Sequence, residues 1–398
     1  MPGAPVAQKG ISRRLTLVLA VACGLAAADL YYAQPLLSTI AVGLGVGSGT
    51  AGLVVTLSQI GYAAGLALLV PAGDMLDRRR LVPVMLLLTA VALAGSAAAP
   101  TAAVLIGLAA LVGVGSVAAQ VLVPLAASLA ADDERGRVVG TVMSGLLLGI
   151  LLARTGSGLV AGVSSWRVVY VAAASVVAIL AGVLWRTLPE ELPRPRPGYP
   201  HLLRSTVSLW LSEPVLRRRS LLGGLGFAAF SVFWTTMAFL LAGPPYHYSD
   251  TVIGLFGLVG AAGALCANAA GRLADRGNDA PATLVFAVAI AVSFLAIWFG
   301  RHSLLALIVG IAVLDVGVQG LQVTNQSVIY RLAPEARSRI NASYMVCYFV
   351  GGAGGSAIAA ALYQSSGWAA VCLLGAAVGV LAVVVSLATG VRRQLQVT

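Results

Sequence analysis

Charged side chains are scarce in this chain. Asp, Glu, Lys and Arg make up 10% of its 398 residues, whereas about a quarter of the residues of a soluble domain are charged. Lysine is almost missing, since Lys9 is the single lysine among 25 Lys and Arg residues. A soluble globular fold needs far more polar surface than this, so the composition excludes that class.

Metal-binding and catalytic residues are also few. The three histidines are scattered, and the four cysteines (Cys23, Cys266, Cys347 and Cys372) lie singly in apolar runs without CxxC spacing. Single cysteines in apolar runs usually act as small buried hydrophobic residues and not as metal ligands or disulfide partners. The sequence has no nucleophile–base pair and no phosphate-binding glycine loop followed by lysine. We therefore expect no metal, no cofactor and no enzymatic activity, and any uphill work must use an ion gradient.

Long apolar runs dominate what is present. Hydrophobic residues form 59% of the chain, and its mean hydropathy is +0.94. A membrane-spanning helix needs roughly 20 apolar residues. The sequence predicts an all-α membrane protein with twelve such helices, at about 15–37, 50–72, 81–99, 102–130, 138–162, 166–187, 219–242, 251–270, 281–300, 304–330, 340–363 and 367–390.

The net charge of +11 is distributed over alternate links between the apolar runs. All but three of the 25 basic residues fall on one side, the exceptions being Arg154, Arg167 and Arg301. This is the pattern of cytoplasmic loops, not a basic face that binds nucleic acid. We expect a multi-pass protein of the bacterial inner (plasma) membrane, surrounded by the lipid bilayer, with both termini cytoplasmic and no nucleic-acid partner.

Two halves with a proline-rich link organise the chain. Residues 188–217 carry six prolines, five of them between 189 and 200, a density that cannot continue a helix, and a short surface helix is expected near 202–211. We predict a six-helix bundle at 1–187, a cytoplasmic linker at 188–217 and a second bundle at 218–398. A shift of 202 residues places Gln120 on Gln322 and Gly149 on Gly351. Two six-helix repeats around a central site are typical of secondary transporters.

A charged loop stands between the second and third predicted spans. It comprises Gly73, Asp74, Asp77, Arg78, Arg79 and Arg80, and a weaker copy at 271–277 contains Asp275 and Arg276. One interpretation is a gating loop that latches the halves through ion pairs and a helix terminus. The alternative is a loop whose arginines only fix the orientation in the membrane. Because two acids exceed what orientation needs, we favour the latch.

These residues resemble a known family. The Gly73–Arg80 loop is similar to the G-x-x-x-D-R-x-x-R signature of the major facilitator superfamily, except for the spacing of the final arginine. Residues 29–37 and 145–155 resemble one branch of its bacterial drug:proton antiporter-like efflux permeases. The resemblance implies two six-helix bundles that work by alternating access. One departure stands out: Ala109 lies four residues before Gly113, where such exporters carry an arginine.

Three charged residues lie away from the ends of the predicted spans, namely Asp29, Arg154 and Asp315. Each costs about 2.5–3.5 kcal/mol at a helix centre on insertion scales and marks function by default. Because the first and fifth spans pack together in the family, we hypothesise that Asp29 pairs with Arg154 and that a proton competes for Asp29. The alternative is that these charges only snorkel or support the structure.

A polar stripe follows Asp315 on its helix. Gln319, Gln322 and Gln326 recur at i+4, i+7 and i+11, which places them on one helical face. We interpret the stripe as a cavity wall, although packing between helices by hydrogen bonds is the alternative. Further substrate-cavity candidates are Tyr31, Tyr32, Gln34, Gln59, Tyr62, Gln120, Asn341, Tyr344 and Tyr348, whereas Phe230, Phe233 and Trp234 are interpreted as a packed aromatic stripe.

Taken together, these features predict a secondary transporter that exports small, moderately apolar molecules, such as drugs, by proton antiport. Its partners would be a small-molecule substrate and protons, and it would act as a monomer. A proton-coupled or uniport carrier of a polar solute, such as a sugar or an organic anion, is the alternative. A membrane receptor without transport is a third interpretation, which the small soluble portion of the chain disfavours.

Overall fold

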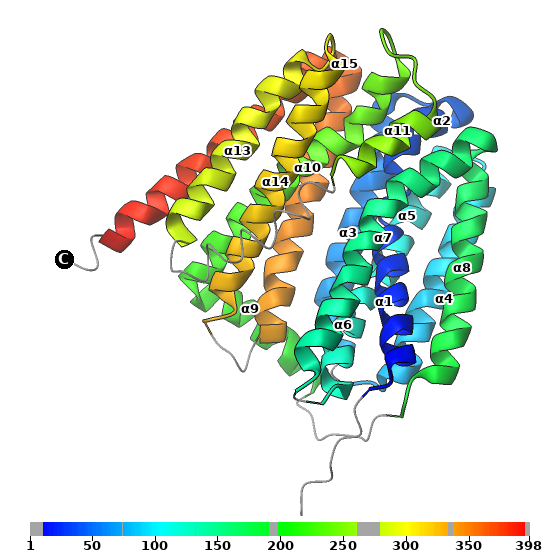
Figure 1. Cartoon of the computed structure of the whole chain (residues 1–398), viewed down its shortest axis with the longest axis vertical. Coiled ribbons are helices and arrows are strands. Elements are labelled where there is room, and N and C mark those ends of the chain that lie inside the picture. Colours follow the sequence, from blue (N-terminus) through cyan, green and yellow to red (C-terminus); the bar gives the residue numbers. More distant parts are fainter. Residues whose placement is uncertain are drawn as a thin grey trace, which may run out of the picture.

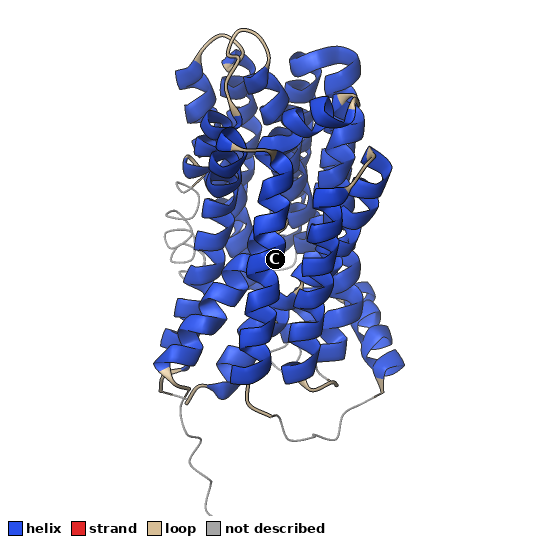
Figure 2. Cartoon of the chain, turned by 90° about the vertical axis from the view of Figure 1, so that its right-hand side faces the viewer, coloured by secondary structure: helices blue, strands red, loops and turns tan. Residues whose placement is uncertain are grey.

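The computed structural model describes residues 11–73, 75–131, 133–190, 198–260, 279–332 and 337–394. Every regular element within these ranges is a helix, and the long helices run roughly side by side (Figure 2). Nine helices in the described part of the chain are long and apolar enough to cross a membrane. The predicted all-helical membrane fold is confirmed.

The N-terminal half, on the right in Figure 1, contains α1 to α8. Its first span consists of α1, the short 3-10 helix η1 and α2, and its fourth span consists of α5 and α6, which adjoin at Val117. The bounds are α1 Arg13–Ala28, η1 Gln34–Leu36, α2 Leu37–Leu44, α3 Ser48–Gly73, α4 Arg78–Ala98, α5 Ala102–Ser116, α6 Ala118–Leu129, α7 Arg135–Val163 and α8 Trp166–Thr187.

The C-terminal half begins after the linker helix α9 (Tyr199–Ser212), which confirms the surface helix expected there. Its elements are α10 Pro214–Ala242, α11 Asp250–Leu255, η2 Phe256–Leu258, α13 Asp279–Phe299, α14 Leu304–Ile329 and α15 Arg337–Gln394. α15 holds both of the last two predicted spans. They are separated at Gly367, whose φ of 70° is a left-handed conformation that glycine adopts readily.

The first span differs from the single continuous helix predicted. α1 ends at Ala28, and the chain passes through turns before η1 begins at Gln34. Pro35 has no N–H, and its ring would clash with the carbonyl of Tyr31 in a continuous α-helix. The backbone N–H of Gln34 instead reaches the Tyr31 carbonyl at 3.3 Å. This break sets the directions of the polar side chains around it.

Paired glycines bring the first and fifth spans of each half together. A Cβ on Gly149 would lie 2.1 Å from the carbonyl oxygen of Gly24, and a Cβ on Gly351 would lie 2.3 Å from that of Gly224. Such contacts admit glycine alone and let helix backbones approach closely. Since Gly149 and Gly351 are related by the 202-residue shift, the same α1–α7 and α10–α15 packing supports the internal repeat.

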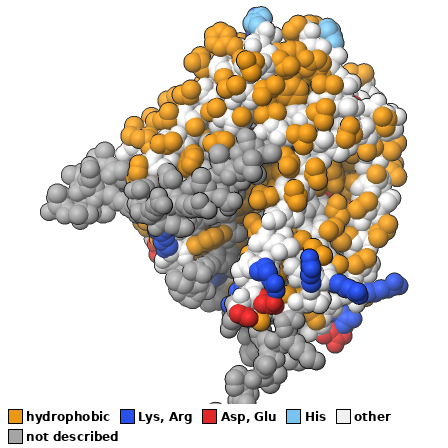
Figure 3. All heavy atoms as spheres, viewed as in Figure 1, with side chains coloured by type: hydrophobic (Ala, Val, Ile, Leu, Met, Phe, Trp, Pro, Cys, Tyr) orange, Lys and Arg blue, Asp and Glu red, His pale blue; other side chains and the backbone are white. Residues whose placement is uncertain are grey.

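The two halves meet along α3 with α15 and along α7 with α11. Charged side chains gather at the lower end of the face in Figure 3, and histidines lie at the upper end. We call the lower end, where the exposed Arg13, Arg14, Arg80, Arg135 and Arg137 lie, the arginine-rich end. The opposite end, which carries His247 and His302, is called the far end.

Candidate functional site

Arg154 of α7 lies at the contact between the halves, where it touches side chains of both. Its side chain is 3% exposed, and its Nε donates a hydrogen bond to Oε1 of Gln34 at 2.7 Å. Its Cζ lies 4.0 Å from the ring centroid of Trp234 and 4.7 Å from that of Tyr31. Desolvated cation–π contacts of this kind contribute about 2 kcal/mol, so delocalised aromatic electrons partly replace water around the buried charge.

Asp315 of α14 reaches the same tryptophan from the other side. Its Oδ1 accepts a hydrogen bond from Trp234 Nε1 at 3.2 Å, and the residue is 4% exposed. Trp234 belongs to α10, so one indole ring contacts a cation of the N-terminal half with its face and an anion of the C-terminal half with its N–H. The two opposite charges therefore interact across the boundary between the halves without a direct ion pair.

The expected pair between Asp29 and Arg154 is absent from the described residues. Asp29 is buried at the end of α1, but neither of its carboxylate oxygens has a hydrogen-bond partner there. The physical reason is the break before Pro35, which turns Tyr31 and Gln34, rather than Asp29, toward Arg154. Arg154 thus belongs with Asp315, and Asp29 is a separate buried acid.

The polar stripe of α14 has two kinds of neighbour. Asp315 contacts Trp234, and Oε1 of Gln322 accepts a hydrogen bond from the hydroxyl of Tyr348 at 2.9 Å. Gln319 and Gln326 are half-buried. In the N-terminal half, Gln120 donates to the hydroxyl of Tyr62 at 3.2 Å, so the two glutamines related by the repeat both bind a tyrosine hydroxyl.

Aromatic rings continue from Arg154 toward the arginine-rich end. Phe230 stacks on Phe227, which stacks on Tyr348 with ring centroids 4.2 Å apart. Tyr62 of α3 lies against Phe349 of α15, also at 4.2 Å. The interpretation of Phe230 and Trp234 as a packed stripe is incomplete, because both rings also flank Arg154. Helical spacing alone could not reveal that role.

The other cavity candidates are spread over several contacts. Gln59 donates to Ser231 Oγ at 3.0 Å, which joins α3 to α10 across the halves. Asn341 accepts from the hydroxyl of Tyr330, and Tyr344 is fully buried against Gly223 inside the C-terminal half. Tyr32 lines a separate lateral cavity. Of the twelve candidates, Tyr31 and Gln34 directly contact Arg154.

The described contacts of the charged loop reach residues of the N-terminal half and Glu190 of the linker. Asp77 caps α4 by accepting from the backbone N–H of Arg79 at 3.0 Å, and Arg78 Nε donates to the Gly73 carbonyl at 2.9 Å. The guanidinium of Arg79 pairs with Glu190, and Arg80 is exposed. Asp74, Asp275 and Arg276 lie outside the described residues. The latch between the halves therefore stays a prediction.

Direct contacts close the far end between the halves. The hydroxyl of Thr39 lies 2.6 Å and 2.7 Å from the two carboxylate oxygens of Asp250, and the N–H of Gly49 donates to Gln364 Oε1 at 2.8 Å. Burial raises the pKa of Asp250, and the hydrogen bond from Thr39 opposes that shift. These contacts join the first and second spans to the eighth and eleventh.

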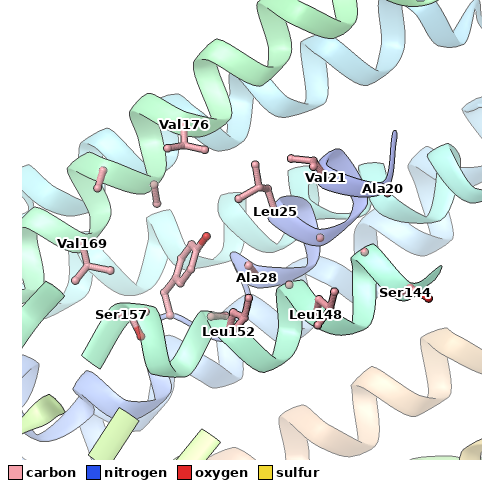
Figure 4. Close-up of a pocket in the computed structure, with 18 of the residues that line it drawn as sticks. Ala20, Val21, Leu25, Ala28, Ser144, Leu148, Leu152, Ser157, Val169 and Val176 are labelled. Atoms are coloured by element: carbon pink, nitrogen blue, oxygen red, sulfur yellow. The ribbon is translucent and has the colours of Figure 1, made fainter. Parts of the chain in front are cut away.

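A lateral cavity of about 670 Å³ lies between α1, α7 and α8 (Figure 4). Leu25, Leu148 and Val176 form part of its apolar lining, to which Gly24 and Gly149 also belong. Because all its lining residues belong to the N-terminal half, this cavity is distinct from the Arg154 site. Among the described residues, no group of three His, Cys, Asp or Glu side chains could hold a metal ion.

Comparisons with known proteins agree with this architecture. A family model described as Major Facilitator Superfamily matches residues 19–302. "Uncharacterized transporter YgaY" of Escherichia coli O157:H7 is 53% identical over 93% of this chain and 94% of its own length. "Probable transporter SCO4007" of Streptomyces coelicolor is 34% identical over 92% of this chain and 86% of its own.

Solved structures share the fold at low sequence identity. The nucleoside transporter NupG has a TM-score of 0.75 at 14% identity, and covers 94% of this chain and 99% of its own. A bacterial homologue of the lysosomal transporter Spinster in an inward-facing, occupied conformation has a TM-score of 0.72 at 14% identity, over 97% and 96%. With these relatives and this fold, the chain belongs to the Major Facilitator Superfamily and is a membrane transport protein rather than an enzyme.

Proposed function

We propose that this chain is a proton-coupled secondary transporter of small, moderately apolar molecules, in which Asp315 takes up the coupling proton. The observation that carries the proposal is the placement of Arg154 and Asp315 on opposite halves and on opposite sides of one buried indole ring. A buried charge that loses its partner is strongly destabilised. A proton on Asp315 would therefore change how well the halves fit together.

Alternating access supplies the motion. The far end is joined by Thr39 with Asp250 and by Gly49 with Gln364, so the cargo site would communicate with the arginine-rich end while these contacts hold. We assign the arginine-rich end to the cytoplasm of a bacterial cell from its basic loops. Protonation then shifts the population between the two arrangements through their different charge balance.

Export by proton antiport is the first form of this proposal. The aromatic surroundings of Arg154 suit an apolar cargo. A cationic molecule would compete with a proton for the negative charge of Asp315, and such competition is what antiport requires. In this form the protein acts as a monomer and lowers the internal concentration of drug-like molecules.

Carriage of an organic anion together with a proton is the second form. It is favoured by one observation: no carboxylate lies within ion-pair distance of Arg154 among the described residues. An anionic cargo would supply that missing partner.

The test uses purified protein in liposomes that contain a pH-sensitive dye. Apolar amines, neutral drugs, sugars and organic acids are added one class at a time, and Asp315→Asn serves as the uncoupled control. Proton movement that depends on one class and is lost in the control supports the proposal, and its sign separates antiport from cotransport. Measurable cargo flux without any proton movement would overturn the coupling, and binding without flux would leave a receptor.

A further inference from the structure

Two buried hydrogen-bond donors at the site lack acceptors. Nη2 of Arg154 and Nε2 of Gln34 are both inaccessible and have no hydrogen-bond partner among the described residues. The two side chains are adjacent, because the 2.7 Å bond from Arg154 Nε to Gln34 Oε1 ties them together. Leaving a buried donor unsatisfied costs about 1–3 kcal/mol, and more for a charged group.

Both donors belong to the N-terminal half, so they stay together when the halves move. Gln34 is fully buried in η1, where Pro35 fixes the local backbone. Arg154 is held over the faces of Tyr31 and Trp234. A ligand would therefore meet a preformed pair of donors next to a positive charge. Space for the ligand would arise on the side of the C-terminal half as the halves separate.

We propose that Arg154 and Gln34 bind the carboxylate of an otherwise apolar organic acid. A carboxylate has two coplanar oxygens that only accept hydrogen bonds, which matches two unsatisfied donors, and a charge-assisted bond to arginine is about twice as strong as a neutral one. A single guanidinium suits one negative charge. The apolar body would lie among the aromatic rings that surround Arg154, as in apolar pockets with a few convergent polar groups.

This inference rests on the proposed transport function and decides between its two forms. The charged and titratable groups that face Asp315 in the described part of the chain are Arg154, Tyr31 and Tyr348. A bound carboxylate adds a second negative charge near Asp315, and a like charge favours the protonated acid. Cargo and proton therefore bind together, so the coupling is cotransport and affinity for the acid rises as the pH falls.

The experiment measures binding by calorimetry to the full-length protein in nanodiscs. Three probes share one aromatic body: 2-naphthoate, its neutral amide 2-naphthamide, and the cation 2-naphthylmethylamine. We expect the carboxylate to bind at least about tenfold more tightly than the amide. Repeating the titration in buffers of different ionisation enthalpy should reveal proton uptake with the carboxylate.

Variants separate the donors from general effects on folding. Arg154→Gln and Gln34→Leu should each remove most of the preference for the carboxylate, whereas Arg167→Gln should leave it unchanged. Arg167 is a matched control, because it also lies over a tryptophan ring, 4.2 Å from Trp166, but it belongs to α8 and donates to the carbonyls of Ala97 and Ala99 rather than to residues of the site. Arg154→Lys, which retains the charge, tests the site if Arg154→Gln fails to fold.

The outcomes distinguish this inference from the transport proposal. Equal or tighter binding of the amide or the amine, no binding of 2-naphthoate up to millimolar concentration, or binding that strengthens as pH rises would overturn the carboxylate site. Carboxylate binding that depends on Arg154, but without flux in liposomes, would support the site and overturn the transport proposal. Proton antiport of the amine without carboxylate binding would do the reverse.

Discussion

The indole N–H of Trp234 donates a hydrogen bond to Asp315 at 3.2 Å while the face of the same ring lies 4.0 Å from Cζ of Arg154. Trp234 is fully buried, so it excludes water from the space between the two charges. In such surroundings their interaction is screened less than at a surface. The ring can therefore transmit a change of charge on Asp315 to Arg154 across the boundary of the halves.

Replacing Trp234 by Phe tests this connection. The variant keeps an aromatic face for Arg154 but removes the N–H that donates to Asp315. Loss of this hydrogen bond to a charged group should cost about 1.5–3 kcal/mol. We expect proton movement per transported molecule to fall in dye-loaded liposomes, with the cargo still bound. Trp185→Phe is the control, since Trp185 is 47% exposed on α8. Unchanged coupling in Trp234→Phe would contradict the role of the N–H.

Asp29→Asn tests the second buried acid. Both carboxylate oxygens of Asp29 are buried without hydrogen-bond partners in the described part of the chain, so a neutral amide avoids the cost of burying a charge. The variant should fold with an unchanged or higher melting temperature. If Asp29 takes up a proton in addition to Asp315, the variant should also lose pH-driven transport. Undiminished pH-driven transport by the variant would refute a proton role for Asp29.

Asp77→Asn separates the charge of the loop from its structural role. Asp77 caps α4, and asparagine is about as good a cap. Stability should therefore change little, whereas transport should be impaired if the carboxylate helps to latch the halves. Equilibrium binding of the cargo serves as the control and should stay within about twofold of wild type. A variant that transports normally would argue against the latch and indicate that the loop only fixes the orientation of the protein in the membrane.

Much of the fold was predictable because hydropathy is local along the chain. The close packing at the paired glycines was also predictable from the sequence, since Gly149 and Gly351 recur at the same place in each half. The partner of Arg154 was not predictable in this way. Asp29 and Arg154 lie at similar depths in their spans. The break before Pro35, however, turns Tyr31 and Gln34 rather than Asp29 toward Arg154.

The contact between Trp234 and Asp315 depends on tertiary packing. The two residues are 81 positions apart on helices α10 and α14, and helical spacing fixes the face of each helix but not which neighbour it meets. The stripe that begins at Asp315 predicted a shared face. It could not reveal that the first residue of the stripe would bind an indole N–H.

Asp250 predicts a pH dependence of the far end. Burial raises its pKa in the closed arrangement, whereas an open far end would expose it to water and return its pKa toward the usual value. The closed state therefore binds the proton more tightly, so closure is favoured as pH falls through the raised pKa and this advantage is lost at higher pH. Hydrogen exchange of the α11 amides, corrected for the intrinsic effect of pH, should show more protection under acidic conditions. Asp250→Asn should remove this dependence, and a variant that retains it would assign the effect to another group.

Gly149→Leu tests whether close approach of α1 and α7 supports the N-terminal half. A side chain at Gly149 would collide with the carbonyl of Gly24, because even a Cβ would lie 2.1 Å from that oxygen. Overpacking typically costs about 1–3 kcal/mol, and backbone on both sides leaves little room to yield, so the melting temperature should fall clearly. Gly156→Leu is the matched control, since Gly156 lies on the same helix and a Cβ there meets none of the described residues within 4 Å. Equal losses in the two variants would attribute the effect to leucine itself. A loss confined to Gly149→Leu would show that close backbone contact between α1 and α7 supports the N-terminal half.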